Sequence, residues 1–384
     1  MAPGLAVGLD ERNANLLFSP LARAQAPAGF GWARAALAQL EPTFLRVDVD
    51  FAQLEPVPGM LRLDMAADGC LRGNPPCAPF AGLSDQLAAA ASQQRAHPGR
   101  FIVVIVVYGV PAWAARAPHG CERAGTAARS RPINAAGLAG YRRLIDALLV
   151  LGAQRGVSLG YWSPWNEPNH PYFISPQRAT CASAARSRAL AVYSTLARAM
   201  RDELAARGVA HHLILGELAA FPHRRPLATG VSELIGGLPR DVLCAADVFA
   251  LHAYARRGQA TVGPGAVREA ERALDARGGC GRRLTLWVTE TGAGAPHAGA
   301  RRPRGSADMR AGCRELAGQL ARWNADPRVT AAFQYTFRED TAFPVGLVDP
   351  SLTRLYPAFY AWRAWSARQG ARGPAPPPVR ECAP

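Results

Sequence analysis

Eight short apolar segments, separated by stretches of helical pattern, constrain the fold of this chain more than any other feature. Each segment is rich in β-branched or aromatic residues and almost continuously hydrophobic, which is typical of strands covered on both faces of a parallel sheet. The third, for example, reads RFIVVIVVYG. The eight segments are residues 4–10, 43–51, 100–109, 158–167, 212–218, 247–254, 284–291 and 330–337.

Three of the intervening stretches show the three- and four-residue spacing of amphipathic helices. They are residues 134–152, 184–206 and 306–324. Asn134 and Ser306 stand where a side chain that caps a helix N-terminus is expected.

Strands that alternate with helices form parallel sheets, and a count of eight favours a closed (β/α)8 barrel, the TIM barrel, over an open sheet. We therefore predict an α/β fold with one barrel domain over residues 1–369. The proline-rich residues 370–384 are expected to form a tail without regular structure on the surface.

The eight cysteines are dispersed along the chain, and none forms a CxxC motif or a zinc-ligand cluster. An even, dispersed set indicates disulfides and an oxidising compartment, so we expect a secreted protein whose export signal has been removed. The sequence leaves the connectivity open. Pairing neighbours along the chain would give Cys70–Cys77, Cys121–Cys181, Cys244–Cys280 and Cys313–Cys382.

Charge and hydropathy bear on possible partners. The net charge is +15, and every cation is an arginine. Because the arginines are scattered along helical stretches and mixed with acidic residues, a solvated surface is favoured over a nucleic-acid footprint. The most apolar run, residues 101–115, contains glycine and proline and is too short to cross a bilayer, so no membrane partner is expected.

Two glutamates fall near the ends of strand segments: Glu167 ends the fourth, and Glu290 lies near the end of the seventh. In TIM barrels the chemistry occurs at the C-terminal ends of the strands, where the fourth and seventh strands face each other across the mouth. Two carboxyl groups about 5 Å apart suit a retaining glycosidase, and a wider gap suits inversion. Trp162 and Trp165 supply the apolar surroundings that keep one carboxyl protonated.

The motifs around these residues resemble those of glycoside hydrolase clan A, and most closely family 39, with family 5-like enzymes next. They are LRVDVDF (45–51), VYGVPAWA (107–114), WNEPN (165–169), LHAY (251–254), TETG (289–292) and GLVDPSLTRLYPAFYAW (346–362). Members of this clan are retaining (β/α)8 glycosidases with catalytic glutamates on the fourth and seventh strands.

The resemblance implies roles for individual residues. Glu167 matches the acid/base and Glu290 the nucleophile, while Asn166 matches the asparagine that binds the sugar 2-hydroxyl. His252 and Tyr254 match the pair on the sixth strand that borders the nucleophile. Arg46 matches the arginine that keeps the nucleophile ionised. The chain departs from the pattern in two respects: it lacks the accessory β-sandwich of family 39 xylosidases, and FQYTFRED replaces the usual eighth-strand tryptophan, so that Tyr335 or Phe337 would support the sugar.

Other assignments are open at this level. Trp165 and Trp287 are candidate sugar platforms, although single tryptophans are more often core residues. Asp10 could bind a sugar hydroxyl or belong to a turn, Arg46 could pair with Asp48 or Asp50, and His252 could be a core histidine. Glu217 is a third carboxylate that could contact sugar or replace one of the catalytic pair.

We thus predict a monomeric retaining glycoside hydrolase that acts on plant or microbial oligosaccharides or polysaccharides without a cofactor or a metal. The alternatives are a catalytically inactive carbohydrate-binding barrel and, less favoured, a basic nucleic-acid-binding protein. Which sugar and linkage would be cleaved, and whether from the chain end or internally, does not follow from the sequence.

Overall fold

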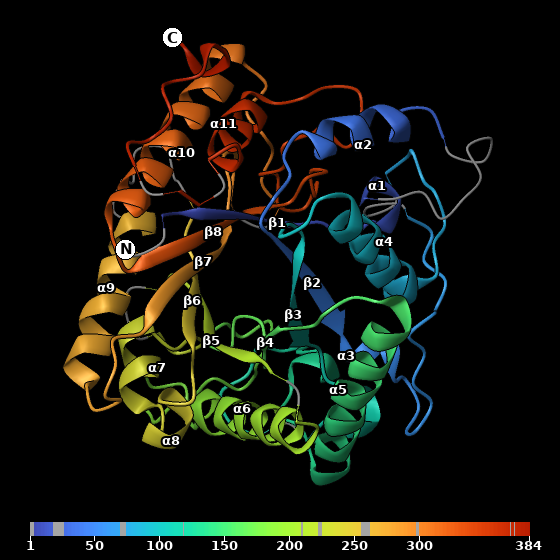
Figure 1. Cartoon of the computed structure of the whole chain (residues 1–384). Helices are drawn as coiled ribbons and strands as arrows, with labels where there is room; N and C mark the ends of the chain where they lie inside the picture. Colours follow the sequence, from blue (N-terminus) through green and yellow to red (C-terminus); the bar gives the residue numbers. More distant parts are fainter. Residues whose placement is uncertain are drawn as a thin grey trace.

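A computed structural model describes residues 4–17, 27–69, 74–117, 119–208, 210–221, 225–254, 262–296, 299–368, 370–371 and 373–384. Eight parallel strands close into a barrel in chain order, with helices around it (Figure 1). The predicted single-domain (β/α)8 TIM barrel is therefore confirmed. The strands are β1 (Ala6–Asp10), β2 (Phe44–Asp50), β3 (Ile102–Tyr108), β4 (Tyr161–Ser163), β5 (His212–Ala219), β6 (Val248–His252), β7 (Thr285–Thr291) and β8 (Val329–Tyr335).

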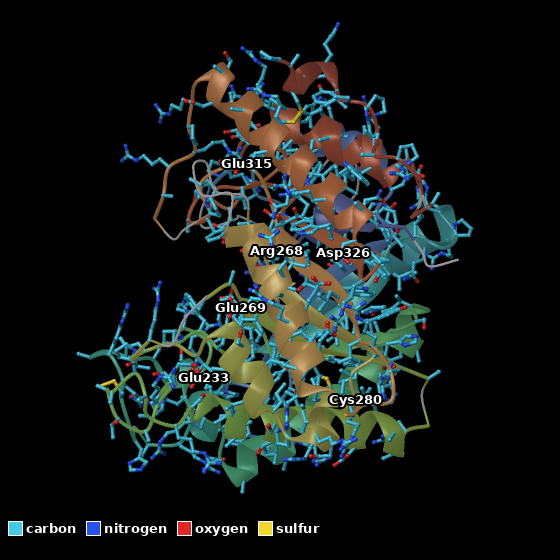
Figure 2. The ribbon with its side chains drawn as sticks, turned by 90° about the vertical axis from the view of Figure 1, so that its left-hand side faces the viewer. Glu233, Arg268, Glu269, Cys280, Glu315 and Asp326 are labelled. Atoms are coloured by element: carbon cyan, nitrogen blue, oxygen red, sulfur yellow. A yellow bond between two sulfur atoms is a disulfide. The ribbon has the colours of Figure 1, made fainter. Side chains whose placement is uncertain are left out.

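The helices surround the strands on the outside of the barrel. They are α1 (Ala14–Leu17), α2 (Phe30–Ala38), α3 (Phe51–Leu54), α4 (Gly82–Ala96), α5 (Ala135–Arg155), α6 (Ala189–Ala206), α7 (Val231–Gly237), α8 (Arg240–Leu243), α9 (Val262–Arg277), α10 (Ser306–Ala325) and α11 (Pro357–Ser366). The helix α9 buries Ala270 and Leu274, while Arg268 is exposed on the outer surface (Figure 2).

The helix ends agree only in part with the sequence pattern. Asn134 caps α5 as predicted, since its side chain accepts a hydrogen bond from the N–H of Gly137 at 2.8 Å. The prediction that Ser306 caps α10 is wrong. Ser306 is the first residue of the helix, and the capping position is occupied by Gly305, which is extended and has no side chain with which to cap. The helix α6 begins at Ala189, later than expected.

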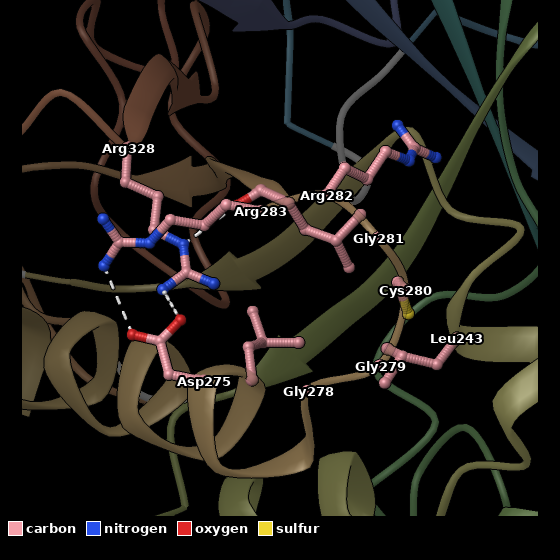
Figure 3. A pocket seen from close by; sticks show the side chains of 11 residues that line it. Leu243, Asp275, Gly278, Gly279, Cys280, Gly281, Arg282, Arg283 and Arg328 are labelled. Atoms are coloured by element: carbon pink, nitrogen blue, oxygen red, sulfur yellow. Dashed lines mark hydrogen bonds and ion pairs between the residues drawn. The ribbon is translucent and has the colours of Figure 1, made fainter.

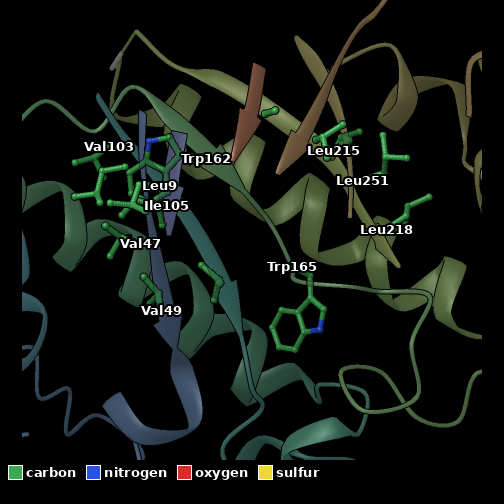
Figure 4. Packing of buried hydrophobic residues seen from close by; sticks show 14 of the residues in the cluster. Leu9, Val47, Val49, Val103, Ile105, Trp162, Trp165, Leu215, Leu218 and Leu251 are labelled. Carbon is green, nitrogen blue, oxygen red and sulfur yellow. The ribbon is translucent and has the colours of Figure 1, made fainter. Parts of the chain in front are cut away.

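A continuous apolar layer fills the space between the strands and the helices. Side chains from neighbouring strands, among them Leu9, Val47, Val103 and Ile105, point outward into it (Figure 4). The inward faces of the strands are also covered, and this double coverage explains why the strand segments are hydrophobic almost throughout rather than alternating.

A second apolar cluster forms a floor inside the barrel. Phe44, Trp287 and Phe333 pack together there, with ring centroids 4.5–5.7 Å apart. Gly8 faces this floor, and a Cβ at that position would lie 2.3 Å from the ring of Phe333. The floor separates the polar mouth of the barrel from the N-terminal ends of the strands.

Among the described residues, three disulfides tie the outer segments together. They are Cys121–Cys181, Cys244–Cys280 and Cys313–Cys382, which confirms three of the four expected pairs. The fourth expected pair includes Cys70, which lies outside the described residues. The bond from Cys382 to α10 anchors the C-terminal tail, and the tail contains one 3₁₀ turn at Arg380–Cys382 although no regular structure was expected there. No helix among the described residues has the length and apolarity needed to cross a membrane.

The floor generates a stability prediction. We expect Gly8→Ala to lower the free energy of unfolding by about 1–3 kcal/mol, because the new methyl group overlaps the buried Phe333 ring. Gly31→Ala in α2 is the matched control: no atom lies within 4 Å of its added Cβ, and alanine favours a helix by roughly 0.5–1 kcal/mol. Urea unfolding of both variants measures the difference, and equal effects would contradict the packing argument.

Candidate active site

Two carboxylates meet at the mouth of the barrel. Glu290 belongs to β7, and Glu167 follows β4 on a turn in which its own φ is 37°. One oxygen of each carboxylate and a ring nitrogen of His252 all lie within 4.8 Å of one another. Residues 123 positions apart are thereby brought together at the C-terminal ends of the strands, as the strand order predicted.

Both oxygens of Glu290 have close polar partners, an ion pair at Oε1 and a hydrogen bond at Oε2. Arg46 lies 3.0 Å from Oε1, and the hydroxyl of Tyr254 donates to Oε2 at 2.6 Å. The Nδ1 atom of His252 lies 3.3 Å from the same Oε2. These contacts fix the orientation of the carboxylate and favour its ionised form.

Arg46 is a fully buried cation at the centre of the site. Besides its ion pair with Glu290, its guanidinium donates to four acceptors: Asp10 Oδ2 at 2.6 Å, Asn166 Oδ1 at 2.6 Å, Asp48 Oδ1 at 3.1 Å and Glu217 Oε2 at 3.1 Å. Both roles considered for Arg46 are therefore present: it pairs with Asp48, and it also holds the candidate nucleophile Glu290. Asp50 pairs with Arg129 instead, at 2.7 Å.

His252 bridges two carboxylates through its two ring nitrogens. Nδ1 lies 2.8 Å from Glu167 Oε1, and Nε2 lies 2.9 Å from Glu217 Oε2. An imidazole that donates to an ionised carboxylate at both nitrogens must carry both protons. Burial lowers the pKa of His252, but the charge of Glu290 and the hydrogen bonds to Glu167 and Glu217 outweigh burial and raise it to about 10.

The two candidate catalytic carboxylates are shifted in opposite directions. Burial raises the pKa of Glu167, but the hydrogen bond and charge of His252 outweigh burial, so the net shift is downward. Burial also raises the pKa of Glu290, and the nearby Glu167 raises it further. His252, Arg46 and Tyr254 oppose these effects without cancelling them. The hydrogen bond between His252 Nδ1 and Glu167, together with these shifts, favours His252 over Glu167 as the holder of the shared proton.

The remaining predicted residues differ in how close they lie to the two carboxylates and in how deeply they are buried. Asn166 lies beside the carboxylates, bound to Arg46. Tyr335 lies at the end of β8, where its hydroxyl is 3.4 Å from Asp340. Asp10 is wholly buried and supports Arg46 rather than facing the mouth. Trp165 is 1% exposed.

The two candidate tryptophan platforms are not brought to the carboxylates. The indole N–H of Trp165 donates to the carbonyl of Phe173 at 3.0 Å within the apolar layer. Trp287 lies in the floor of the barrel, and its indole donates to Thr330 at 2.9 Å. The distribution of tryptophans along the sequence therefore does not identify the sugar platform.

The sequence does not point to Thr289 as a member of the network, and it points to Asp48 only as a possible partner of Arg46. Thr289 donates to Glu217 Oε2 at 3.0 Å, and Asp48 pairs with both Arg46 and Arg12. Thr289 lies in the TETG motif, and Asp48 lies two residues after Arg46, so their inward orientation follows once the strand register is known. Glu217, a candidate sugar contact in the sequence, is wholly buried instead.

The cluster of Glu167, His252 and Glu290 is compact enough that a metal ion could be considered. However, Glu290 forms an ion pair with Arg46 and accepts a hydrogen bond from Tyr254, and His252 is engaged at both nitrogens. We therefore interpret the cluster as a hydrogen-bonded ionic network.

A separate hollow of about 290 Å³ lies near the N-terminal ends of β7 and β8, away from this network. Arg283 and Arg328 line it, and both pair with Asp275, at 3.2 and 2.8 Å (Figure 3). Arg328 also donates to the carbonyl of Leu284 at 2.8 Å. These bonds tie α9 to the barrel, so the arginines have a structural explanation.

The fold and the network together define a TIM barrel with a carboxylate pair at the C-terminal ends of its strands. Solved glycoside hydrolases share this fold. GH5_18 from Streptomyces cattleya, solved with GlcNAc, aligns with 98% of this chain and 83% of its own, at a TM-score of 0.60 and 17% identity. A family 39 glycoside hydrolase from Bacteroides cellulosilyticus WH2 aligns with 96% of this chain and 64% of its own, at a TM-score of 0.56 and 14% identity.

A conserved exported protein from Bacteroides fragilis aligns similarly, over 97% of this chain and 79% of its own, with a TM-score of 0.61 and 11% identity. At these identities the likeness is one of fold. No protein-family model matches the sequence, and no curated protein matches it.

The buried position of Arg46 gives a prediction for stability and its pH dependence. Arg46→Met should lower the free energy of unfolding by about 3–5 kcal/mol at pH 7, because it leaves several buried carboxylates without their cation. Burial raises the pKa of Glu217, but Arg46, His252 and Thr289 outweigh it and lower that pKa. A lowered pKa stabilises the fold above the unfolded value and ceases to do so as pH falls, so the loss should shrink below about pH 5.

Denaturant unfolding of the unaltered protein and of Arg46→Met at pH 7 and pH 3 measures this dependence, because the contribution of Glu217 is lost as pH falls from its unfolded value through its lower folded value. Arg207→Met is the control, because it removes a solvent-exposed ion pair with Asp146, and such pairs contribute little to stability. A loss for Arg46→Met that stays constant across this pH range would contradict the electrostatic explanation.

Proposed function

We propose that this protein is a retaining glycoside hydrolase of clan A, with Glu290 as the nucleophile and Glu167 as the acid/base. The observation that carries the proposal is the pair of carboxylates whose oxygens lie within 4.8 Å of each other. Retaining enzymes hold their two carboxyl groups about 5–5.5 Å apart, whereas inverting enzymes need room for a water molecule.

In the first step, Glu290 attacks the anomeric carbon and forms a glycosyl ester, while the glycosidic bond to the leaving oxygen breaks. Arg46 and Tyr254 hold the attacking carboxylate in place, so little reorganisation is needed as the reaction proceeds. Asn166, fixed by Arg46, is placed to bind the 2-hydroxyl next to the reacting carbon.

The leaving oxygen takes its proton from Glu167. Because Glu167 shares a 2.8 Å hydrogen bond with His252, the two titrate as a coupled pair, and the proton held on Nδ1 can pass to the carboxylate. In the second step, Glu167 accepts a proton from water, the water oxygen bonds to the anomeric carbon, and the ester to Glu290 breaks.

The substrate class proposed is a neutral oligosaccharide or polysaccharide. Arg12 and Arg129 lie near the mouth, but Asp48 and Asp50 pair with them, so they offer little net charge to an acidic sugar. Solved structures that share the fold include a GH30 xylanase and an exo-β-1,4-mannosidase, both named for neutral sugars. The three disulfides support a place in an oxidising, extracellular compartment.

The nucleophile assignment predicts the effect of Glu290→Gln. Its kcat on an activated aryl glycoside, chosen by screening the unaltered protein, should fall by roughly a thousandfold or more, because the amide cannot form the glycosyl ester. Glu55→Gln is the control, since Glu55 is equally buried and paired with Arg143 at 2.8 Å without joining the network. Near-normal turnover by Glu290→Gln would contradict the assignment. A carbohydrate-binding protein without activity would show no hydrolysis in the initial screen.

The acid/base assignment predicts rescue by an external nucleophile. Glu167→Ala should slow aryl glycosides with poor leaving groups more than those with good ones, because only the former need the proton. Azide should restore part of the rate and give a glycosyl azide that retains the anomeric configuration, which NMR of the product identifies. An azide of inverted configuration would show that no ester forms on Glu290.

A further inference from the structure

We propose that Glu217 is a positioning residue that keeps His252 doubly protonated and thereby sets the upper pH limit for catalysis by Glu167 and Glu290. This inference rests on the function proposed above and adds a third carboxylate to it. Glu217 is 0% exposed, so it cannot touch a substrate and must act through its neighbours.

A single oxygen of Glu217 joins three parts of the network. Oε2 accepts from His252 Nε2 at 2.9 Å, from Thr289 Oγ1 at 3.0 Å and from Arg46 Nη2 at 3.1 Å. The backbone carbonyl of Glu217 also accepts the N–H of Glu167 at 3.0 Å. Glu217 therefore contacts the residues that hold Glu290 and, independently, the turn that carries Glu167.

An irregularity in β5 directs Glu217 into the barrel. The pairing of β5 with β6 shifts between Leu215 and Leu218, and both residues in between have positive φ: 101° at Gly216 and 52° at Glu217. A Cβ at Gly216 would lie 2.3 Å from the carbonyl oxygen of Ala250. Such bulges redirect a side chain and are frequent next to active sites.

The groups that face His252 explain why Glu217 matters to its charge. Carboxylates approach it from three elements: Glu167 after β4, Glu217 on β5 and Glu290 on β7. Arg46 is bound to Glu217 and Glu290, and His170 lies close enough to interact with His252 electrostatically. Tyr254 shares the β6 end, and Tyr193 is the further titratable group near Glu217.

Among these, Glu217 alone binds Nε2, whereas Glu167 and Glu290 both approach Nδ1. A neutral Glu217 removes the anion that holds the Nε2 proton. His252 then becomes neutral at lower pH and can no longer donate at both nitrogens. Glu167 loses either its hydrogen bond or the proton that it passes to the leaving oxygen.

The test is Glu217→Gln, which keeps the shape of the side chain and removes its charge. We expect the alkaline limb of kcat/KM for an aryl glycoside to move down by about one pH unit or more. Glu55→Gln should leave the pH profile unchanged. An unmoved alkaline limb in a folded Glu217→Gln protein would overturn the proposal.

Nitrogen NMR of ¹⁵N-histidine-labelled protein reports the protonation of His252, and it requires neither enzymatic activity nor the Glu217→Gln variant. The His252 signals, assigned by their loss in His252→Gln, should show both ring nitrogens protonated at pH 7 in the unaltered protein. A neutral ring there would refute the proposal even if Glu217→Gln failed to fold. A protein that hydrolyses no glycoside but holds a charged His252 would instead refute the proposed function, and only the protonation of His252 would remain supported.

Discussion

The structure depends on one buried cation, the guanidinium of Arg46. Moving a charge into a protein interior costs several kcal/mol unless ionic partners and hydrogen bonds replace the lost water. Arg46 has five such partners. They come from β1, β2, β5, β7 and the segment after β4. Because these partners come from several separate strands, the charge of Arg46 is compensated only where those strands are brought together.

The rest of the barrel makes that network rigid. Below it, the aromatic floor of Phe44, Trp287 and Phe333 excludes water and fixes the depth of the polar layer. Around it, the apolar layer between strands and helices leaves the strands no freedom to slide. Interiors packed this closely transmit small displacements rather than absorbing them. Arg46, Glu217, His252 and Glu290 all stand on strands, and rigid elements hold reacting groups more accurately than loops do.

The sequence predicts the barrel well because strands buried on both faces leave long apolar runs, and all eight runs became strands. It predicts the meeting of Glu167 and Glu290 because residues at strand ends share one rim in this fold. The same runs carry no alternation, however, so they do not reveal which side chains point inward. For that reason Trp287 could not be assigned to the floor in advance. The inward orientation of Glu217 depends on a bulge in β5. The residues at this bulge read GEL, which does not differ from the end of a regular strand, so the sequence does not predict that orientation.

The network contains more negative than positive charge, and this imbalance bears on the kind of reaction that the site could favour. Five carboxylates, Asp10, Asp48, Glu167, Glu217 and Glu290, surround three cations, Arg12, Arg46 and His252. Burial and Asp48 raise the pKa of Asp10 far above its usual range, and burial and Glu167 raise that of Glu290, which is how the site responds to unbalanced charge. The transition state of glycoside cleavage is an oxocarbenium-like cation. A preorganised pocket that is short of positive charge stabilises such a cation more than the neutral sugar that precedes it. In the reaction proposed for this site, the electrostatic cost of the unbalanced charge would be reduced as positive charge develops on the sugar.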